Sequence, residues 1–298
     1  MTQTNPAATL SAAAAGTLSI GADLQVHRLG FGAMRLTGPG VWGAPADRPE
    51  AIRVLRRALE LGVNFIDTAD SYGPNVSEEL IAQALAPYDG VIVATKAGLV
   101  RPGPGVWNAD GRPEHLREAL GGSLRRLRRD QIDLYQFHRP DPDVPFEESL
   151  GTFVEAKRAG KIRHIGLSNV SLDELERAVA MTEIASVQNR YSALDRHSQR
   201  VLEECERRRI AFIPWFPLAA GEATVAEGAL ETVARDHGAT SGQIALAWLL
   251  AVSPAMLPIP GTSRIDHLEE NVAAAEIVLS AADLEALSPA GPAGRLDR

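Results

Sequence analysis

Short apolar runs rich in β-branched residues alternate along the chain with longer segments of helical periodicity. This alternation predicts a parallel sheet, because each helix carries the chain back to the start of the next strand. Apolar runs of strand length lie at residues 30–34, 63–67, 91–95, 132–138, 162–168, 185–188, 211–215 and 256–259. The expected helices lie at residues 48–61, 76–86, 113–128, 146–159, 171–180, 195–208, 240–252, 265–274 and 281–287.

Two of the expected helices begin with capping signals. Asp47 precedes a proline and Glu50, which is typical of an N-cap followed by a proline-containing first turn. Ser171 and Glu174 have the spacing of a capping box, in which each residue bonds the backbone of the other. These signals support the alternation of strands and helices.

The number of strand–helix units predicts a closed (β/α)8 TIM barrel, which typically takes about 250 residues. An open doubly wound sheet normally stops at five or six strands. No shift in composition marks a boundary, so we expect a single domain over residues 16–298. Residues 17–28 are expected to form a β-hairpin that closes the bottom of the barrel, and residues 1–15 to form a disordered tail.

Composition and charge exclude several classes of protein. The 298 residues carry a formal charge of −8, opposite in sign to that of a typical nucleic-acid binder. Cys205 is the only cysteine, which fits a reducing compartment. No signal peptide or membrane-spanning run is evident, and the seven histidines lack the spacing of a metal site. We therefore expect a cytoplasmic protein without a metal and without a nucleic-acid or membrane partner.

Three common motifs of catalytic loops are absent. Gly30 and Gly32 begin a dinucleotide fingerprint, but Arg35 stands where the third glycine is required. The phosphate-binding P-loop is also missing, and residues 166–170 break the nucleophile-elbow pattern of a serine hydrolase at its last position. The chemistry must therefore come from another arrangement.

Four polar residues lie at the ends of successive strands, where a barrel has its mouth. Asp67, Lys96 and His138 each close or directly follow a strand, and Tyr72 comes five residues after Asp67. A buried lysine requires a partner, and Asp67 is the obvious one. We expect the Lys96 ammonium to lower the pKa of Tyr72, and His138 to donate a hydrogen bond to a substrate oxygen. Such a site would polarise a carbonyl group and protonate it.

Two long Gly/Pro-rich loops follow strands, at residues 37–49 and 98–113. They carry Trp42 and Trp107, which either line an apolar substrate pocket together with Met34 or pack only within their own loops.

The chain resembles the aldo-keto reductase family, and within it the bacterial-type reductases. The resemblance rests on residues 64–73, 95–96, 136–138, 160–169, 259–263 and 270–271, which occur in the family's order. It implies a (β/α)8 barrel that reduces aldehydes or ketones to alcohols by hydride transfer from NADPH. It also implies that Tyr72 is the proton donor, that Lys96 and Asp67 tune it, and that His138 orients the carbonyl.

The resemblance further implies a nicotinamide cofactor site. Ser168, Asn169 and Gln188 match residues that hold the carboxamide, and Trp215 matches an aromatic residue that stacks on the ring. The residues assigned to the cofactor are Ala33, Met34, Asp67, Ser168, Asn169, Gln188, Trp215, Phe216, Pro217, Leu218, Gly261, Ser263, Arg264, His267, Glu270 and Asn271.

The choice between NADPH and NADH depends on the loop that receives the adenosine phosphate. Gly261 and His267 stand where many members of the family have a lysine and an arginine that hold the 2′-phosphate. Arg264 is the remaining cation, and its guanidinium suits a phosphate monoester. We therefore expect NADPH rather than NADH.

Two other functions fit the same resemblance. One is an NADPH-binding regulatory barrel, similar to a channel β-subunit, with little turnover. The other is a dehydrogenase that acts mainly on sugars or alcohols. Retention of His138 favours an enzyme over the regulatory barrel, and the equilibrium position and the cellular cofactor ratio would decide between reduction and oxidation. The expected partner is a small carbonyl substrate.

Overall fold

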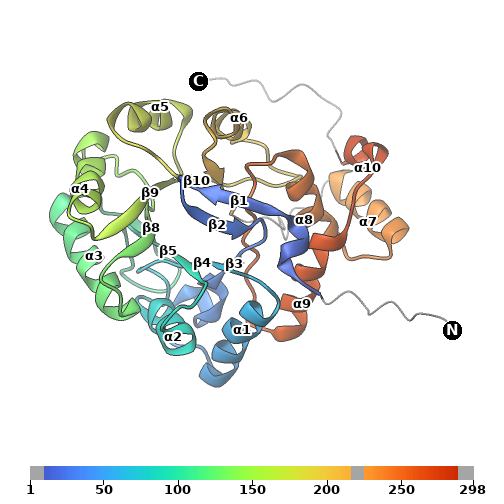
Figure 1. The fold of residues 1–298 in the computed structure, drawn as a ribbon, viewed down its shortest axis with the longest axis horizontal. Coiled ribbons are helices and arrows are strands. Elements are labelled where there is room, and N and C mark those ends of the chain that lie inside the picture. Colours follow the sequence, from blue (N-terminus) through green and yellow to red (C-terminus); the bar gives the residue numbers. More distant parts are fainter. Residues whose placement is uncertain (1–9, 216–224, 288–298) are drawn as a thin grey trace.

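The structure is a computed structural model that describes residues 10–215 and 225–287. Its main sheet is parallel and strongly curled, with the strand order β11-β10-β9-β8-β5-β4-β3 (Figure 1). The strands are β3 (Phe31–Gly32), β4 (Phe65–Asp67), β5 (Ile92–Ala97), β8 (Ile132–Phe137), β9 (Ile162–Ser168), β10 (Ser186–Gln188) and β11 (Ala211–Phe212).

Residues 256–260 close the barrel between the two edges of this sheet. The amide nitrogen of Leu257 donates to the carbonyl oxygen of Phe212 on one side at 2.8 Å, and that of Gly30 donates to Pro258 on the other at 3.0 Å. Two prolines in this segment remove ladder donors, so it bonds both neighbours without forming a regular strand. The predicted (β/α)8 barrel is confirmed, with an irregular eighth strand.

Helices surround the barrel (Figure 1). They are α1 (Arg48–Glu60), α2 (Val76–Leu85), α3 (Pro113–Leu127), α4 (Phe146–Arg158), α5 (Leu172–Met181), α6 (Gln199–Arg208), α7 (Val225–His237), α8 (Ser241–Val252), α9 (Ile265–Ala273) and α10 (Ala281–Ala286). Both predicted caps are confirmed: the side chain of Asp47 accepts from the amide of Glu50, and Ser171 and Glu174 form a capping box. Helix α7 is absent from the prediction, and Gly228 within it weakens the helical pattern.

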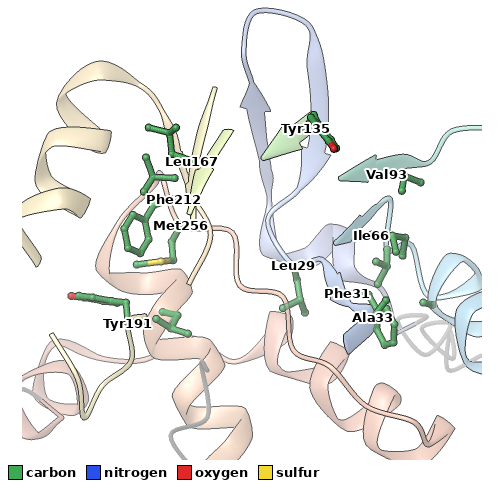
Figure 2. Close-up of a cluster of buried hydrophobic side chains, with 14 of the residues drawn as sticks. Leu29, Phe31, Ala33, Ile66, Val93, Tyr135, Leu167, Tyr191, Phe212 and Met256 are labelled. Atoms are coloured by element: carbon green, nitrogen blue, oxygen red, sulfur yellow. The ribbon is translucent and has the colours of Figure 1, made fainter. Parts of the chain in front are cut away.

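The predicted N-terminal hairpin is confirmed as β1 (Thr17–Ile20) and β2 (Leu24–His27), paired antiparallel. Its side chains Ile20, Leu24 and Val26 are buried in one cluster with inward-facing barrel residues such as Leu134. A second core lies between the strands and the helices and includes Leu29, Ile66 and Tyr135 (Figure 2). The hairpin therefore fills one end of the barrel and leaves the other end open.

Residues 11–15, which fall within the predicted tail, have a defined structure. Ser11 caps a 3-10 turn at Ala12–Ala15, and the amide of the fully buried Ala12 donates to Leu61 at 2.8 Å. The prediction of disorder is therefore wrong for residues 11–15, because an alanine run carries no sequence signal for this docking. Within the described ranges, no helix has the length and apolarity needed to cross a bilayer.

Candidate active site

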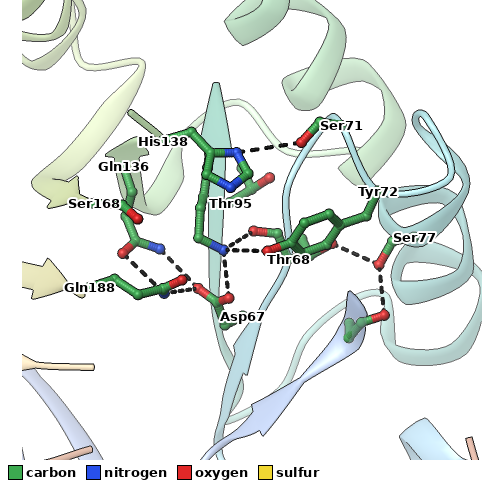
Figure 3. A network of polar contacts seen from close by, with 12 residues as sticks. Asp67, Thr68, Ser71, Tyr72, Ser77, Thr95, Gln136, His138, Ser168 and Gln188 are labelled. Carbon is green, nitrogen blue, oxygen red and sulfur yellow. Dashed lines mark hydrogen bonds and ion pairs between the residues drawn. The ribbon is translucent and has the colours of Figure 1, made fainter. Parts of the chain in front are cut away.

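A buried polar cluster that includes Asp67, Thr68 and Tyr72 lies at the carboxyl ends of β4 and β5 (Figure 3). Lys96 is its centre. Its Nζ atom donates to Oδ1 of Asp67 at 2.6 Å, to the carbonyl oxygen of Thr68 at 2.9 Å and to the hydroxyl of Tyr72 at 3.3 Å. Three acceptors satisfy the three donors of an ammonium group. Parallel strands end at one edge of the barrel, which is why residues far apart in the sequence meet here.

Two amide side chains hold the other oxygen of Asp67. Gln136 from β8 and Gln188 from β10 each donate from Nε2 to Oδ2 of Asp67 at 2.9 Å. A buried ion pair is tolerated when its remaining lone pairs are hydrogen-bonded, and here they are. Sequence analysis assigned no role to Gln136, because its contact with Asp67 exists only once the sheet is curved.

His138 lies beside Tyr72 at the end of β8. The two rings meet edge to face with centroids 5.9 Å apart, and Nδ1 of His138 lies 3.4 Å from the hydroxyl of Ser71. Burial, together with the charge of Lys96, lowers the pKa of His138 well below 6.5. His138 is therefore a neutral imidazole at physiological pH, which carries one ring N–H group.

The pKa of Tyr72 is raised, which contradicts the expected lowering. Burial of the ring raises this pKa above 10, and the nearby Lys96 ammonium only partly opposes it. Burial also acts to lower the pKa of Lys96, but the charges and hydrogen bonds of Asp67 and Tyr72 together outweigh it, and the net direction is upward. The expectation failed because it counted the charge and left out desolvation of the phenolate. Tyr72 is thus protonated, and Lys96 charged, at neutral pH.

A cavity of about 520 Å³ opens in front of Tyr72 and His138. Its walls come from the carboxyl ends of all eight barrel strands and from the loops that follow them. The lining residues are Gly32, Met34, Arg35, Val41, Asp67, Tyr72, Leu99, Trp107, His138, Arg139, Ser168, Asn169, Gln188, Trp215, Ile259, Pro260 and Gly261. Within the described ranges, no three His, Cys, Asp or Glu side chains gather as a metal site requires.

The two tryptophans expected in the substrate pocket behave differently. Trp107 lines the cavity, between the short strands β6 (Leu99–Val100) and β7 (Asn108–Ala109), which were not predicted. Trp42 does not line it; its backbone bridges Gly73 in the neighbouring loop. For Trp42, packing among the loops is the reading that the structure supports.

The residues assigned to the cofactor divide into three groups. Those that line the cavity are Met34, Asp67, Ser168, Asn169, Gln188, Trp215 and Gly261. Those that do not are Ala33, which is fully buried, and Ser263, Arg264, His267, Glu270 and Asn271, which lie in the loop after the eighth strand and in α9. Phe216, Pro217 and Leu218 lie outside the described residues.

Asn169 connects the cofactor residues with His138. It has a left-handed backbone conformation with φ of +58°. Its Nδ2 donates to the carbonyl oxygen of His138 at 3.0 Å, and its Oδ1 accepts from the indole N–H of Trp215 at 3.1 Å. These bonds fix the position of Trp215 at the cavity wall.

The loop that is expected to bind the adenosine phosphate contains charged residues. The guanidinium of Arg264 is paired with the carboxylate of Asp266, and both side chains are exposed. Arg35 also carries a charge at this end of the cavity, next to Gly261: a Cβ atom on Gly261 would lie 3.5 Å from its Cγ. The sequence suggested Arg35 only as the residue that breaks a glycine motif.

A parallel barrel with a buried tyrosine–lysine–aspartate cluster and a neutral histidine at its open end defines a class of oxidoreductases that act on carbonyl and alcohol groups. Residues 28–290 match the Aldo/keto reductase family. The chain belongs to this family.

Similar proteins cover nearly the whole chain. An uncharacterized oxidoreductase of Schizosaccharomyces pombe is 50% identical over 280 residues, which are 94% of this chain and 91% of that protein. Pyridoxine 4-dehydrogenase of Escherichia coli is 43% identical over 263 residues, which are 86% of this chain and 91% of that protein. The crystal structure of an aldo/keto reductase from Klebsiella pneumoniae in complex with NADP and acetate is 28% identical, with a TM-score of 0.78 over 94% of this chain and 98% of that one.

Proposed function

We propose that the protein reduces aldehydes or ketones to alcohols with NADPH, and that Tyr72 delivers the proton. The observation that carries this proposal is the contact between the Tyr72 hydroxyl and the buried Lys96 ammonium, 3.3 Å long, at the wall of the cavity. An ammonium in this position stabilises the phenolate that forms as the proton leaves.

The residues at the cavity wall fit a nicotinamide ring. The carboxamide of that ring needs both donors and acceptors, which the hydroxyl of Ser168 and the side-chain oxygens of Asn169 and Gln188 can supply. Gln188 uses its amide nitrogen on Asp67, which leaves its oxygen to face the ligand. Trp215 offers an aromatic ring at the same wall. When bound, the reduced nicotinamide supplies the hydride.

The chain's own residues account for the proton. The neutral imidazole of His138 donates a hydrogen bond to the carbonyl oxygen of the substrate and orients it beside Tyr72. As a hydride reaches the carbonyl carbon, the C=O bond becomes a C–O bond and its oxygen takes the proton of the Tyr72 hydroxyl. The remaining phenolate is held by Lys96 until a proton from solvent restores it. Asp67 keeps the ammonium charged and fixed.

The preference for NADPH follows from positive charge at one end of the cavity. The Klebsiella pneumoniae relative is described in complex with NADP. In this chain Arg35 lies beside Gly261, and Arg264 directly precedes α9, whose N-terminal dipole favours an anion. A guanidinium and a helix terminus together suit the 2′-phosphate that distinguishes NADPH from NADH.

The decisive experiment compares the wild type with Tyr72→Phe, which removes one hydroxyl and keeps the ring. NADPH oxidation is followed with a panel of aromatic aldehydes, aliphatic aldehydes, sugars and pyridoxal. We expect turnover with at least one carbonyl compound and a loss of at least about a hundredfold in kcat for the variant. A wild type without turnover, or a variant with unchanged kcat, overturns the proposal.

A dehydrogenase working in the opposite direction is the second candidate. The similarity to Escherichia coli pyridoxine 4-dehydrogenase favours it, because that name describes oxidation of an alcohol. The same groups serve both directions, with the Tyr72 phenolate accepting the proton during oxidation. The ratio of kcat/KM for pyridoxine with NADP+ to that for pyridoxal with NADPH distinguishes the two. The complete cluster around Lys96 argues against a regulatory barrel with little turnover.

A further inference from the structure

Arg101 is a largely buried cation behind the cavity wall that forms part of no group described above. Its side chain is 8% exposed, and its hydrogen-bond acceptors are all backbone carbonyl oxygens. Nη1 donates to Val41 at 2.9 Å and to Ser71 at 3.1 Å, Nη2 donates to Gly40 at 2.8 Å, and Nε donates to Val106 at 2.8 Å. Four of the five guanidinium N–H groups are therefore used.

These acceptors belong to three different loops. Gly40 and Val41 lie in the loop after β3, Ser71 lies next to Tyr72 in the loop after β4, and Val106 lies between β6 and β7. One planar guanidinium thus joins three segments that are distant in the sequence. A lysine could not replace it, because an ammonium lacks the fixed fork of donors that reaches all three loops.

The same guanidinium stacks on Trp107. Its Cζ atom lies 3.5 Å from the centroid of the indole ring. Trp107 in turn meets Tyr72 and His138 edge to face, with centroids 6.3 Å and 6.5 Å apart. Arg101 therefore holds an aromatic ring beside the two groups that face the substrate, and that ring lines the cavity.

We infer that Arg101 is a positioning residue that fixes Trp107 as one wall of the pocket and thereby favours flat aromatic carbonyl substrates. This inference rests on the proposed function. A flat ring gains contact with a fixed indole, since aromatic pairs are worth about 0.5–1.5 kcal/mol beyond their buried area, or roughly two- to tenfold in affinity. A small aliphatic aldehyde gains little from that wall.

The test compares benzaldehyde with propanal in the wild type, Arg101→Ala, Trp107→Ala and the double variant. We expect each single variant to raise KM for benzaldehyde up to about tenfold and KM for propanal by less than about twofold. We expect kcat to change by less than about threefold, because the reacting groups remain. If Arg101 acts through Trp107, the double variant has the KM of Trp107→Ala rather than the product of both effects.

Four further measurements separate positioning from general loss of structure. Arg112→Ala is the matched control, because Arg112 lies on the same segment, is exposed and pairs with Asp110. Its KM values should equal those of the wild type. Arg101→Lys should retain most of the thermal stability and still show the raised KM for benzaldehyde. Millimolar guanidinium chloride, but not sodium chloride, should partly restore the KM of Arg101→Ala, and the Kd for NADPH from tryptophan fluorescence should not change.

Several results overturn the inference. Equal changes for benzaldehyde and propanal, effects of Arg101→Ala and Trp107→Ala that multiply, or a wild-type KM in Arg101→Lys would each do so. If Arg101→Ala does not fold, Arg101→Lys decides by the same comparison. A wild type without carbonyl reduction instead overturns the proposed function and this inference with it, so the two failures are distinguishable.

Discussion

Replacing Lys96 with methionine removes the charge beside Tyr72 while keeping most of the volume of the side chain. The ammonium nitrogen lies 3.3 Å from the Tyr72 hydroxyl. At an effective dielectric constant of about 20, two unit charges at that distance attract by about 5 kcal/mol. If about half of the phenolate charge has developed in the transition state, the loss is about 2.5 kcal/mol, or roughly 70-fold in kcat.

The assay is kcat for the best carbonyl substrate, measured with saturating NADPH. Tyr72→Phe is measured alongside, because a tyrosine that cannot lose its proton without Lys96 should resemble a phenylalanine. The Kd for NADPH is expected to change little, since Lys96 is fully buried behind the cavity wall. The effect should therefore appear in kcat, because the interaction between Lys96 and the developing phenolate is made only in the transition state.

Folding must be controlled, because methionine leaves Asp67 as a buried charge with two amide donors and no cation. Breaking a buried ion pair by removing one partner costs about 3–5 kcal/mol. The double variant Lys96→Met with Asp67→Asn removes both charges, and we expect it to recover stability in thermal unfolding without recovering kcat. If either variant keeps kcat within about threefold of the wild type, the assignment of Lys96 to the proton transfer is refuted.

Three further outcomes are expected. The pKa of His138 is well below 6.5 in the folded protein, so around that pH the unfolded chain binds a proton that the folded chain does not. The resulting stabilisation is complete above pH 6.5 and is lost as the pH falls below 6.5. Thermal unfolding at a series of pH values measures this loss, and the His138→Phe variant should not show it. Gly32→Ala would place a Cβ atom 2.6 Å from a backbone oxygen of the eighth barrel strand, and denaturant unfolding should show a free energy of unfolding lower by about 1–3 kcal/mol. The control Gly103→Ala has open space around the new Cβ atom and should leave the free energy of unfolding unchanged. Asp266→Asn frees the guanidinium of Arg264 and should lower the Kd for NADPH by about two- to fivefold without a matching change in the Kd for NADH. Equal changes for both cofactors would show that Arg264 does not bind the 2′-phosphate.

The fold was predictable where the information is local. The caps at Asp47 and Ser171, and the apolar runs of the long strands, depend on residues a few positions apart, and the structure has them as expected. The eighth strand was correctly located, but it is irregular because its two prolines lack N–H donors; they accept hydrogen bonds from the β3 side, whereas Leu257 bonds the β11 side. The pairing of β6 with β7 was missed because these strands have two residues each, too few for a pattern.

The candidate site was predictable for residues that end strands. Asp67, Lys96 and His138 could be placed together because a parallel barrel brings strand ends to one edge. Arg101 and Gln136 could not be found in this way. Arg101 bonds only backbone oxygens, which every residue has, so no pattern of side chains in the sequence identifies its partners.

At the end of the cavity near Gly261, where the cofactor phosphate is expected, the absence of one motif residue does not determine the local charge. The sequence has no lysine at Gly261, and this left Arg264 as the expected cation. In the structure Arg264 is paired with Asp266, and Arg35, from the loop after β3, also lies next to Gly261; both arginines are exposed. A Cβ atom on residue 261 would lie 2.5 Å from the backbone oxygen of Gly32, so glycine there allows the two segments to approach closely, with Arg35 beside them. The positive charges near this end of the cavity therefore come from two loops, with Arg35 on one and Arg264 on the other, and the closure of the barrel brings these loops together.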